Sequence, residues 1–115
     1  QGQAEAQFNL ALKYYFGRGG KQDYMKAREW YLKAASQGQD EAQFNLARMY
    51  NFGQGGKQDY MKAREWYLKA ASQGHAKAQF TMGIMYEKGQ GGKQDFVKAQ
   101  EWYLKAASQG QDEAQ

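Results

Sequence analysis

The sequence repeats itself every 36 residues, and this periodicity limits the possible folds more than any other feature. Residues 1–36 differ from residues 37–72 only at positions 4, 12, 13, 15 and 18, whereas residues 73–108 are more diverged. Repetition at this period is typical of arrays in which each unit packs mainly on its neighbours. We therefore expect three repeats, 1–36, 37–72 and 73–108, followed by the start of a truncated fourth repeat at 109–115.

The first half of each repeat has the apolar spacing of a helix, which in the second copy covers residues 40–52. Its apolar stripe consists of Ala42, Leu46 and Tyr50. Gly53 is expected to end the helix, because glycine tolerates the left-handed conformation found just after a last turn. Either Gln39 or Asp40 is expected to cap its start, and Gln43 stands where it could complete a capping box.

The second half of each repeat predicts another helix, which Asp59 caps in the second copy and which runs to about residue 72. Its broad apolar face consists of Tyr60, Ala63, Trp66, Tyr67, Ala70 and Ala71. Lys62, Glu65 and Lys69 lie opposite, at a spacing that allows ion pairs on the surface. The serines that we expect to close these second helices are Ser36, Ser72 and Ser108.

Small residues recur at one position of the first helix, as Ala11, Ala47 and Gly83, and they predict close approach of the second helix. Each repeat is therefore expected to be a helical hairpin. Hairpins repeated in register stack on one another. The predicted fold is all-α, a right-handed α-solenoid of stacked antiparallel helical hairpins.

Composition argues against several classes of function. The chain has no cysteine, which excludes disulfides, thiol nucleophiles and cysteine-based metal sites. It has no apolar run long enough to cross a bilayer, so we expect no membrane insertion. Its net charge of +4 comes from basic residues interleaved with acids, and without a concentrated basic stripe we expect no nucleic-acid partner. Because the chain lacks an initiator Met and ends within a repeat, we expect it to be a piece of a longer array.

No candidate for catalysis or cofactor binding stands out from the repeat. The glycine-rich link from Gly17 to Lys21 lacks the preceding strand and the following Ser or Thr of a phosphate-binding loop. His75 is the only histidine and has no cysteine to join it in a metal site, so it is interpreted as a polar residue at a helix start. Acids that recur identically, such as Glu65, fit surface ion pairs better than an acid–base pair. We therefore expect no enzymatic activity, no metal and no cofactor.

The combined spacing resembles that of the Sel1-like repeat, a relative of the tetratricopeptide repeat. The pattern is A-x-A-Q-F-x-L-A/G-x-x-Y-x-x-G-x-G, followed by Q-D-Y/F-x-K-A-x-E-W-Y-L-K-A-A-S-Q-G, and it recurs three times. The resemblance implies a non-catalytic scaffold that assembles other proteins. It also has one departure: Gly20, Gly56 and Gly92 stand where the family usually has an aliphatic residue. Loss of that residue implies looser hairpins.

The first helix varies more between copies than the second, and its variable positions fall opposite the apolar stripe. In related solenoids the first helices line the concave surface, so this strip would face a groove. Its unusual apolarity suits the binding of a peptide or a protein. The residues predicted to contact the partner are Leu12, Tyr15, Phe16, Arg48, Asn51, Phe52, Ile84, Glu87 and Lys88.

Two alternatives to a binding groove remain open. The variation could be drift at unconstrained surface positions, because three copies do not separate drift from selection. The chain could instead be a self-associating structural element, with open apolar faces on its first and last hairpins that stack on other copies. The near identity of the repeats fits both recent duplication and design toward a consensus.

Overall fold

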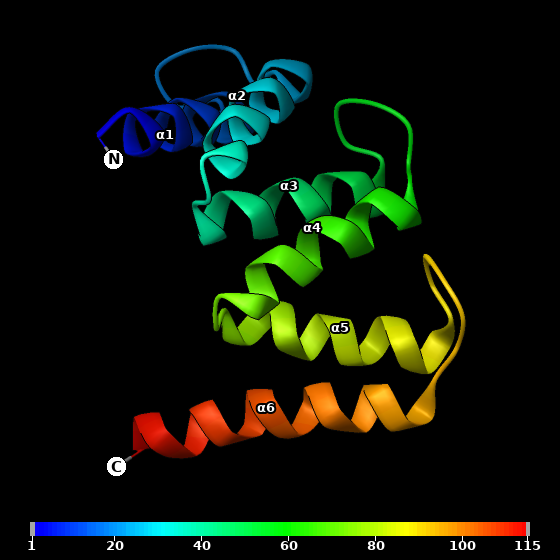
Figure 1. Ribbon diagram of the computed structural model, residues 1–115. Coiled ribbons are helices and arrows are strands. Elements are labelled where there is room, and N and C mark those ends of the chain that lie inside the picture. Colours follow the sequence, from blue (N-terminus) through cyan, green and yellow to red (C-terminus); the bar gives the residue numbers. More distant parts are fainter. Residues whose placement is uncertain (1, 115) are drawn as a thin grey trace.

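The computed structural model describes residues 2–114, with side chains up to residue 109, and it consists of six α-helices over that range. They are α1 (Gly2–Phe16), α2 (Tyr24–Ser36), α3 (Asp40–Phe52), α4 (Tyr60–Ser72), α5 (Ala76–Lys88) and α6 (Phe96–Ala114). Residue 115, the last of the predicted fourth repeat, and the side chains of 110–114 lie outside the description. Figure 1 shows the helices as antiparallel pairs stacked on one another, with each pair in contact with the next through α2 and α3 or α4 and α5. The prediction of an all-α solenoid of helical hairpins is confirmed.

The helix ends follow the local chemistry that the sequence predicts. The Asp59 carboxylate accepts a hydrogen bond from the backbone N–H of Lys62 at 3.0 Å, and Asp23 and Asp95 cap α2 and α6 in the same way. Gly53 adopts the left-handed conformation, with a φ of 68°, directly after α3. The predicted helix over residues 40–52 is confirmed at both ends.

The predicted end of the third hairpin at Ser108 is wrong, because α6 continues to Ala114. After α2 and α4 the chain turns at Gly38 and Gly74, whose φ values are 97° and 96°. In those repeats the next helix packs its apolar stripe against the hairpin just completed. At the corresponding place of the third repeat, Gly110 lies within α6, and the chain does not turn.

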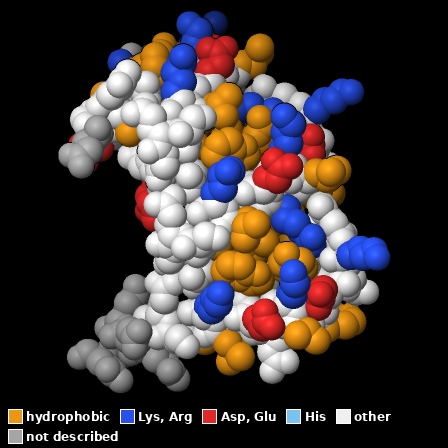
Figure 2. All heavy atoms as spheres, viewed as in Figure 1, with side chains coloured by type: hydrophobic (Ala, Val, Ile, Leu, Met, Phe, Trp, Pro, Cys, Tyr) orange, Lys and Arg blue, Asp and Glu red, His pale blue; other side chains and the backbone are white. Residues whose placement is uncertain are grey.

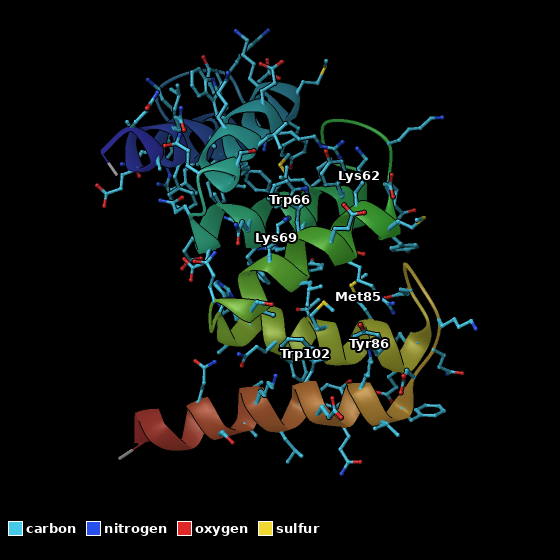
Figure 3. All side chains as sticks on the ribbon, in the orientation of Figure 1. Lys62, Trp66, Lys69, Met85, Tyr86 and Trp102 are labelled. Carbon is cyan, nitrogen blue, oxygen red and sulfur yellow. The ribbon has the colours of Figure 1, made fainter. Side chains whose placement is uncertain are left out.

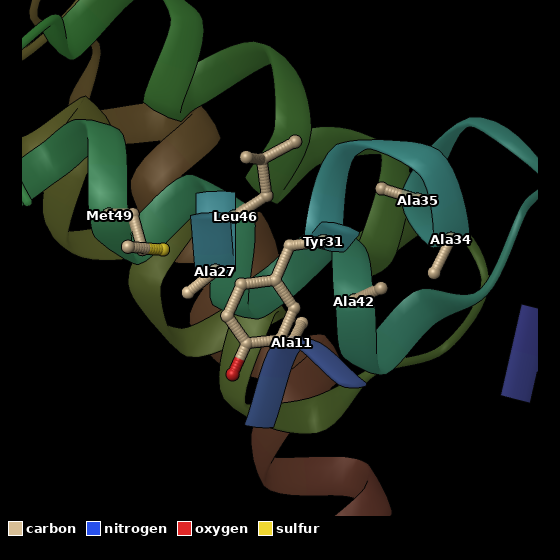
Figure 4. Packing of buried hydrophobic residues seen from close by; sticks show 8 residues of the cluster. All are labelled: Ala11, Ala27, Tyr31, Ala34, Ala35, Ala42, Leu46 and Met49. Atoms are coloured by element: carbon tan, nitrogen blue, oxygen red, sulfur yellow. The ribbon is translucent and has the colours of Figure 1, made fainter. Parts of the chain in front are cut away.

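The core lies between the hairpins and consists mainly of alanines around a few large side chains (Figure 4). Tyr31 of α2 packs in one cluster with Leu46 and Met49 of α3, and Leu46 is fully buried. The small residues of the first helices permit close packing, as predicted. A Cβ atom at Gly83 would come within 2.5 Å of the Tyr103 ring, so only glycine fits there without a shift of that ring.

The expectation of looser hairpins supposed a gap at the glycines. At Gly56 and Gly92 that gap is absent, because arginine side chains from the preceding repeat occupy the adjacent space, whereas no atom lies within 4 Å of a Cβ position at Gly20. The Nη2 atom of Arg28 donates a hydrogen bond to the Met49 carbonyl at 3.1 Å, and its guanidinium lies over the Tyr50 ring at 4.3 Å. A Cβ atom at Gly56 would approach Arg28 Nη1 to 2.5 Å. Partial burial lowers the pKa of Arg28 from its usual value. The space under the link of the second hairpin is therefore filled by Arg28 of the first repeat rather than by a side chain of the link itself.

Arg64 forms the same junction between the second and third repeats. Its Nη2 atom donates to the Met85 carbonyl at 3.2 Å, and its guanidinium lies 4.2 Å from the centre of the Tyr86 ring. The corresponding residue of the third repeat is Gln100. An arginine that binds a helix-terminal carbonyl of the next repeat is therefore a feature of both internal junctions.

Gln43 does not form the predicted capping box. Its buried amide instead donates to the Ala35 carbonyl of the preceding repeat at 3.2 Å, and its Oε1 atom accepts from Gln73 at 2.9 Å. Gln79 repeats this arrangement with Ala71. The N-cap of α3 is Gln39, which forms no side-chain capping bond. These glutamines join consecutive hairpins at the helix ends opposite the arginines.

Candidate functional site

The first helix of each repeat turns one face away from the core. Phe16, Phe52 and Phe80 on α1, α3 and α5 are each more than half exposed, at 55%, 63% and 53%. Removal of such side chains from water would be favourable, yet the stacking of the hairpins leaves them accessible. Phe16 and Phe52 hold the same position in their repeats, and exposed phenylalanines there suit contact with another molecule. Phe80 holds a different position, that of Phe44, and lines a hollow beside α6.

A groove of about 430 Å³ lies between α3 and α5. It brings together five of the residues predicted to contact a partner, which are Arg48, Asn51, Phe52, Ile84 and Lys88. Its remaining lining consists of Phe44, Gln58, Tyr60, Tyr67, Thr81, Met85 and Gln90. The groove therefore combines an apolar wall with amide groups and two basic side chains.

A smaller hollow of about 70 Å³ continues from Arg48 toward the first repeat. It is lined by the predicted residues Leu12, Tyr15 and Phe16 and by Tyr31, Asn45 and Arg48. The Tyr15 hydroxyl donates to Oε1 of Gln54 at 3.1 Å, so the ring is held in place by the neighbouring link. Because Arg48 lines both hollows, the predicted residues form two neighbouring sites, with Glu87 as the exception.

Glu87 forms a hydrogen bond within its own hairpin instead of lining the groove. Its Oε1 atom accepts a hydrogen bond from the Tyr103 hydroxyl at 2.7 Å, and it lines neither hollow. The helical wheel places it on the edge of the variable strip but cannot show that α6 offers it a partner.

Sequence reasoning missed some residues of the groove. Gln58 and Gln90 come from the links between helices, where no periodicity reports on side-chain direction. Gln58 also donates to the carbonyl of Asn51 at 2.7 Å, which fixes the link against α3. Tyr67 was assigned to the core, and its ring is 2% exposed, but one edge reaches the groove.

The charges near the groove are unevenly paired. Among the described residues, one contact joins an acid to a basic side chain: Nε2 of His75 donates a hydrogen bond to Oε1 of Glu41 at 3.3 Å. His75 also accepts the Ala78 N–H at 3.1 Å through Nδ1 and stacks on Phe44 with ring centres 4.7 Å apart. This confirms the interpretation of His75 as a polar residue at a helix start. Arg48 lies 5.9 Å from the centre of the Phe44 ring, without an acidic partner among the residues that the structure describes.

The face formed by α4 and α6 has a different character. Figure 2 shows apolar areas on it, bordered by basic and acidic side chains. Lys62 and Lys69, labelled on α4 in Figure 3, lie over aromatic rings, with Nζ 5.8 Å from the centre of the Tyr50 ring and 5.5 Å from that of Trp66. The predicted ion pairs with Glu65 are absent from the described part of the chain, because the lysines contact these rings instead.

The described residues contain neither a metal-binding cluster nor a membrane-spanning helix. No group of three or more His, Cys, Asp or Glu side chains lies close enough to hold a metal ion there. None of the helices in that range combines the length and the apolarity that crossing a membrane requires.

The family model described as Sel1 repeat matches residues 4–39, 40–75 and 76–111. The chain belongs to the Sel1 repeat family. In this division each Sel1 repeat begins at or near the start of its first helix. The first two matches cover one hairpin and the turn that follows, and the third ends inside α6. Proteins with Sel1 repeats are generally non-catalytic scaffolds that bind other proteins.

Solved structures agree with this assignment. A protective antigen present in uropathogenic Escherichia coli strains, described as displaying an SLR fold, is 45% identical with a TM-score of 0.93, and the match covers 96% of this chain and 24% of that one. A Sel1 repeat protein from Oxalobacter formigenes is 40% identical with a TM-score of 0.89, over 91% of this chain and 43% of that one. Both relatives are therefore much longer than the region they share with this chain.

A more distant structure shares the fold alone. Helicobacter pylori cysteine rich protein B is 18% identical with a TM-score of 0.75, over 93% of this chain and 88% of that one. No curated protein matches the sequence.

Proposed function

We propose that this Sel1 repeat chain is a non-catalytic scaffold that binds a peptide or protein segment along the exposed face of its first helices. The observation that carries the proposal is the groove between α3 and α5, where Phe52 stays 63% exposed beside Arg48. Aromatic and arginine side chains are favoured at binding hot spots, because they offer large contact area and several hydrogen bonds.

The shape of the two hollows favours an extended occupant. They lie on neighbouring repeats and meet at Arg48, so a single extended segment can enter both. Amide groups of Asn51 and Gln58 accompany the apolar lining and can pair with the backbone of such a segment. A partner of this kind needs no cofactor and no metal.

The proposal is tested by selecting binding peptides from a displayed library with the chain as bait. Replacing Phe52 and Arg48 together by Ala is expected to weaken binding about tenfold to a hundredfold, because two hot-spot side chains are lost. Circular dichroism should show unchanged helix content, since both side chains are exposed. The matched control replaces Lys62 and Lys69 by Ala on the other face. Loss of binding only in the control would place the site on the α4 and α6 face and refute the proposal.

A second candidate function is self-association, which a hollow of about 800 Å³ beside α6 favours. It is lined mainly by apolar side chains, among them Phe80, Tyr103, Ala106 and Ala107. The counterparts Ala70 and Ala71 are buried where α5 covers α4. Sedimentation experiments test this alternative. It is favoured if the apparent mass of the chain rises with concentration and if the Ala107→Glu variant stays monomeric over the same range.

A further inference from the structure

We infer that the groove between α3 and α5 accepts an acidic segment that also carries apolar side chains. This inference rests on the proposed function and names the chemistry of the partner. It follows from the charges and the lining of the groove.

Every charged side chain that lines the groove is basic. Arg48 enters it from α3 and Lys88 from α5, and none of its lining residues is an acid. Lys77 lines an adjoining hollow together with Arg48 and one acid, Glu41. None of these three cations has an ion-pair partner among the described side chains. Three unpaired cations on one face produce a local positive potential that attracts an anionic partner.

The nearest acids, Glu41 and Glu87, keep their negative charge but do not line the groove, and each is held by a hydrogen bond elsewhere. Glu41 pairs with His75 at 3.3 Å, and Glu87 accepts the Tyr103 hydroxyl at 2.7 Å. The position of Glu41 in the second repeat is held by Lys77 in the third. The positive charge is therefore concentrated on the third repeat, toward which the acidic end of a bound segment would point.

The apolar lining argues for a peptide rather than for a nucleic acid. Phe44, Phe52 and Ile84 offer an apolar wall between the basic residues. An acidic peptide can insert leucine or phenylalanine side chains there while its carboxylates face Arg48 and Lys88. A nucleic-acid site would need a longer row of cations along the phosphate backbone.

The test uses three fluorescent peptides of equal length with the same leucine and phenylalanine positions. Between these positions stand Asp and Glu, their amide isosteres Asn and Gln, or Lys and Arg. The acidic peptide is expected to bind roughly tenfold more tightly than the amide peptide, because two exposed charge pairs form, and the advantage should shrink in high salt. The double variant Arg48→Gln and Lys88→Gln should remove this advantage. The control variant Lys33→Gln and Lys69→Gln, with the same change in net charge on the other face, should retain it.

The other outcomes separate the two proposals. Equal binding of the acidic and amide peptides, weakened by Phe52→Ala, would overturn the charge inference and leave the groove as the binding site. Failure of all three peptides to bind would overturn both. A mixed-sequence single-stranded oligonucleotide that binds more tightly than the acidic peptide, and depends on Arg48 and Lys88, would assign the groove to nucleic acid. An equal loss in both double variants would show a non-specific charge effect and also overturn the inference.

Discussion

Leu46 is buried between two hairpins, where it contacts side chains of α2 and α3 in the first core cluster. Leu46→Ala is expected to lower the free energy of unfolding by about 2–5 kcal/mol, because the removed atoms leave a cavity between helices that cannot fully close. Urea denaturation measures the change. Leu68→Ala, at a leucine of α4 that is 41% exposed, is the matched control and should cost less than about 1 kcal/mol. Equal losses in the two variants would contradict the assignment of Leu46 to the core.

Two buried tyrosines make stability depend on alkaline pH. Burial raises the pKa of Tyr31 to about 12, and burial also raises the pKa of Tyr67. The unfolded chain releases these protons near pH 10, before the folded chain does, so their contribution is complete below about pH 10 and is lost as pH rises toward the folded pKa. Each tyrosine therefore lowers the free energy of unfolding by up to about 1.4 kcal/mol per pH unit in that range.

The double variant Tyr31→Phe and Tyr67→Phe isolates this effect. The loss of stability between about pH 9 and pH 11.5 should be about 1–3 kcal/mol smaller in the variant than in the parent chain. Urea titrations at both pH values measure it. A pH dependence identical to that of the parent would show that these hydroxyls are not desolvated in the fold.

At the scale of single residues, the sequence predicts those roles that depend on the local chain. Burial of Leu46 and capping by Asp59 both follow from spacing within one helix. Gln43 was misinterpreted because its partner, the Ala35 carbonyl, belongs to the preceding repeat. A capping box and a junction between repeats require the same residue type at the same distance from the helix start, and only the stacking of hairpins distinguishes them.

At the scale of elements, the link between helices is most sensitive at its middle glycine. Gly55 has a φ of 79°, and a Cβ atom there would lie 2.5 Å from the Tyr24 carbonyl oxygen. Gly55→Ala is expected to cost about 2–4 kcal/mol, because the left-handed conformation and the collision with backbone both oppose it. Gly20→Ala is the control, since no atom lies within 4 Å of its Cβ position, and it should change stability by less than about 0.5 kcal/mol. Thermal melting of both variants measures the difference. A melting temperature of Gly55→Ala equal to that of the parent chain would mean that the link does not touch the preceding hairpin.

Element boundaries were largely predictable because glycine and aspartate mark them in every repeat. The filling of the space under the link was not predictable, because the side chain that fills it, Arg28, belongs to another hairpin. The end of α6 was misplaced because Gly110 lies within the helix, whereas Gly38 and Gly74 adopt positive φ in the turns after α2 and α4. The first of these errors concerns a contact between repeats.

At the scale of the whole molecule, the arginines determine how strongly the repeats unfold together. Arg64→Gln, which copies the residue at position 100, is expected to lower the free energy of unfolding by about 1–3 kcal/mol. The hydrogen bond to the Met85 carbonyl and the contact with Tyr86 are both lost. Denaturant unfolding should also become less steep, because the last hairpin separates from the others more easily. Arg48→Gln, at an exposed arginine with no carbonyl partner, should leave midpoint and slope unchanged, and a similar effect of both variants would refute the role of Arg64.

The candidate site was predictable in part at the same scale. The helical wheel placed Leu12, Arg48 and Ile84 on one strip, and the structure brings them into neighbouring hollows. The wheel could not show that the links add amides to the groove, or that Glu87 is occupied by Tyr103. Those facts depend on the spacing between repeats, which one helix does not encode.

The separation of the two faces of α3 also bears on how such a chain can change over time. Ala42 and Leu46 hold the hairpins together, while Arg48 and Phe52 point away from every contact that maintains the array. Substitutions on the outward face can therefore accumulate without lowering the free energy of unfolding. A duplicated repeat keeps the residues that stack on its neighbours. New specificities can then arise by exchange of a few side chains on a scaffold that does not need to be rebuilt.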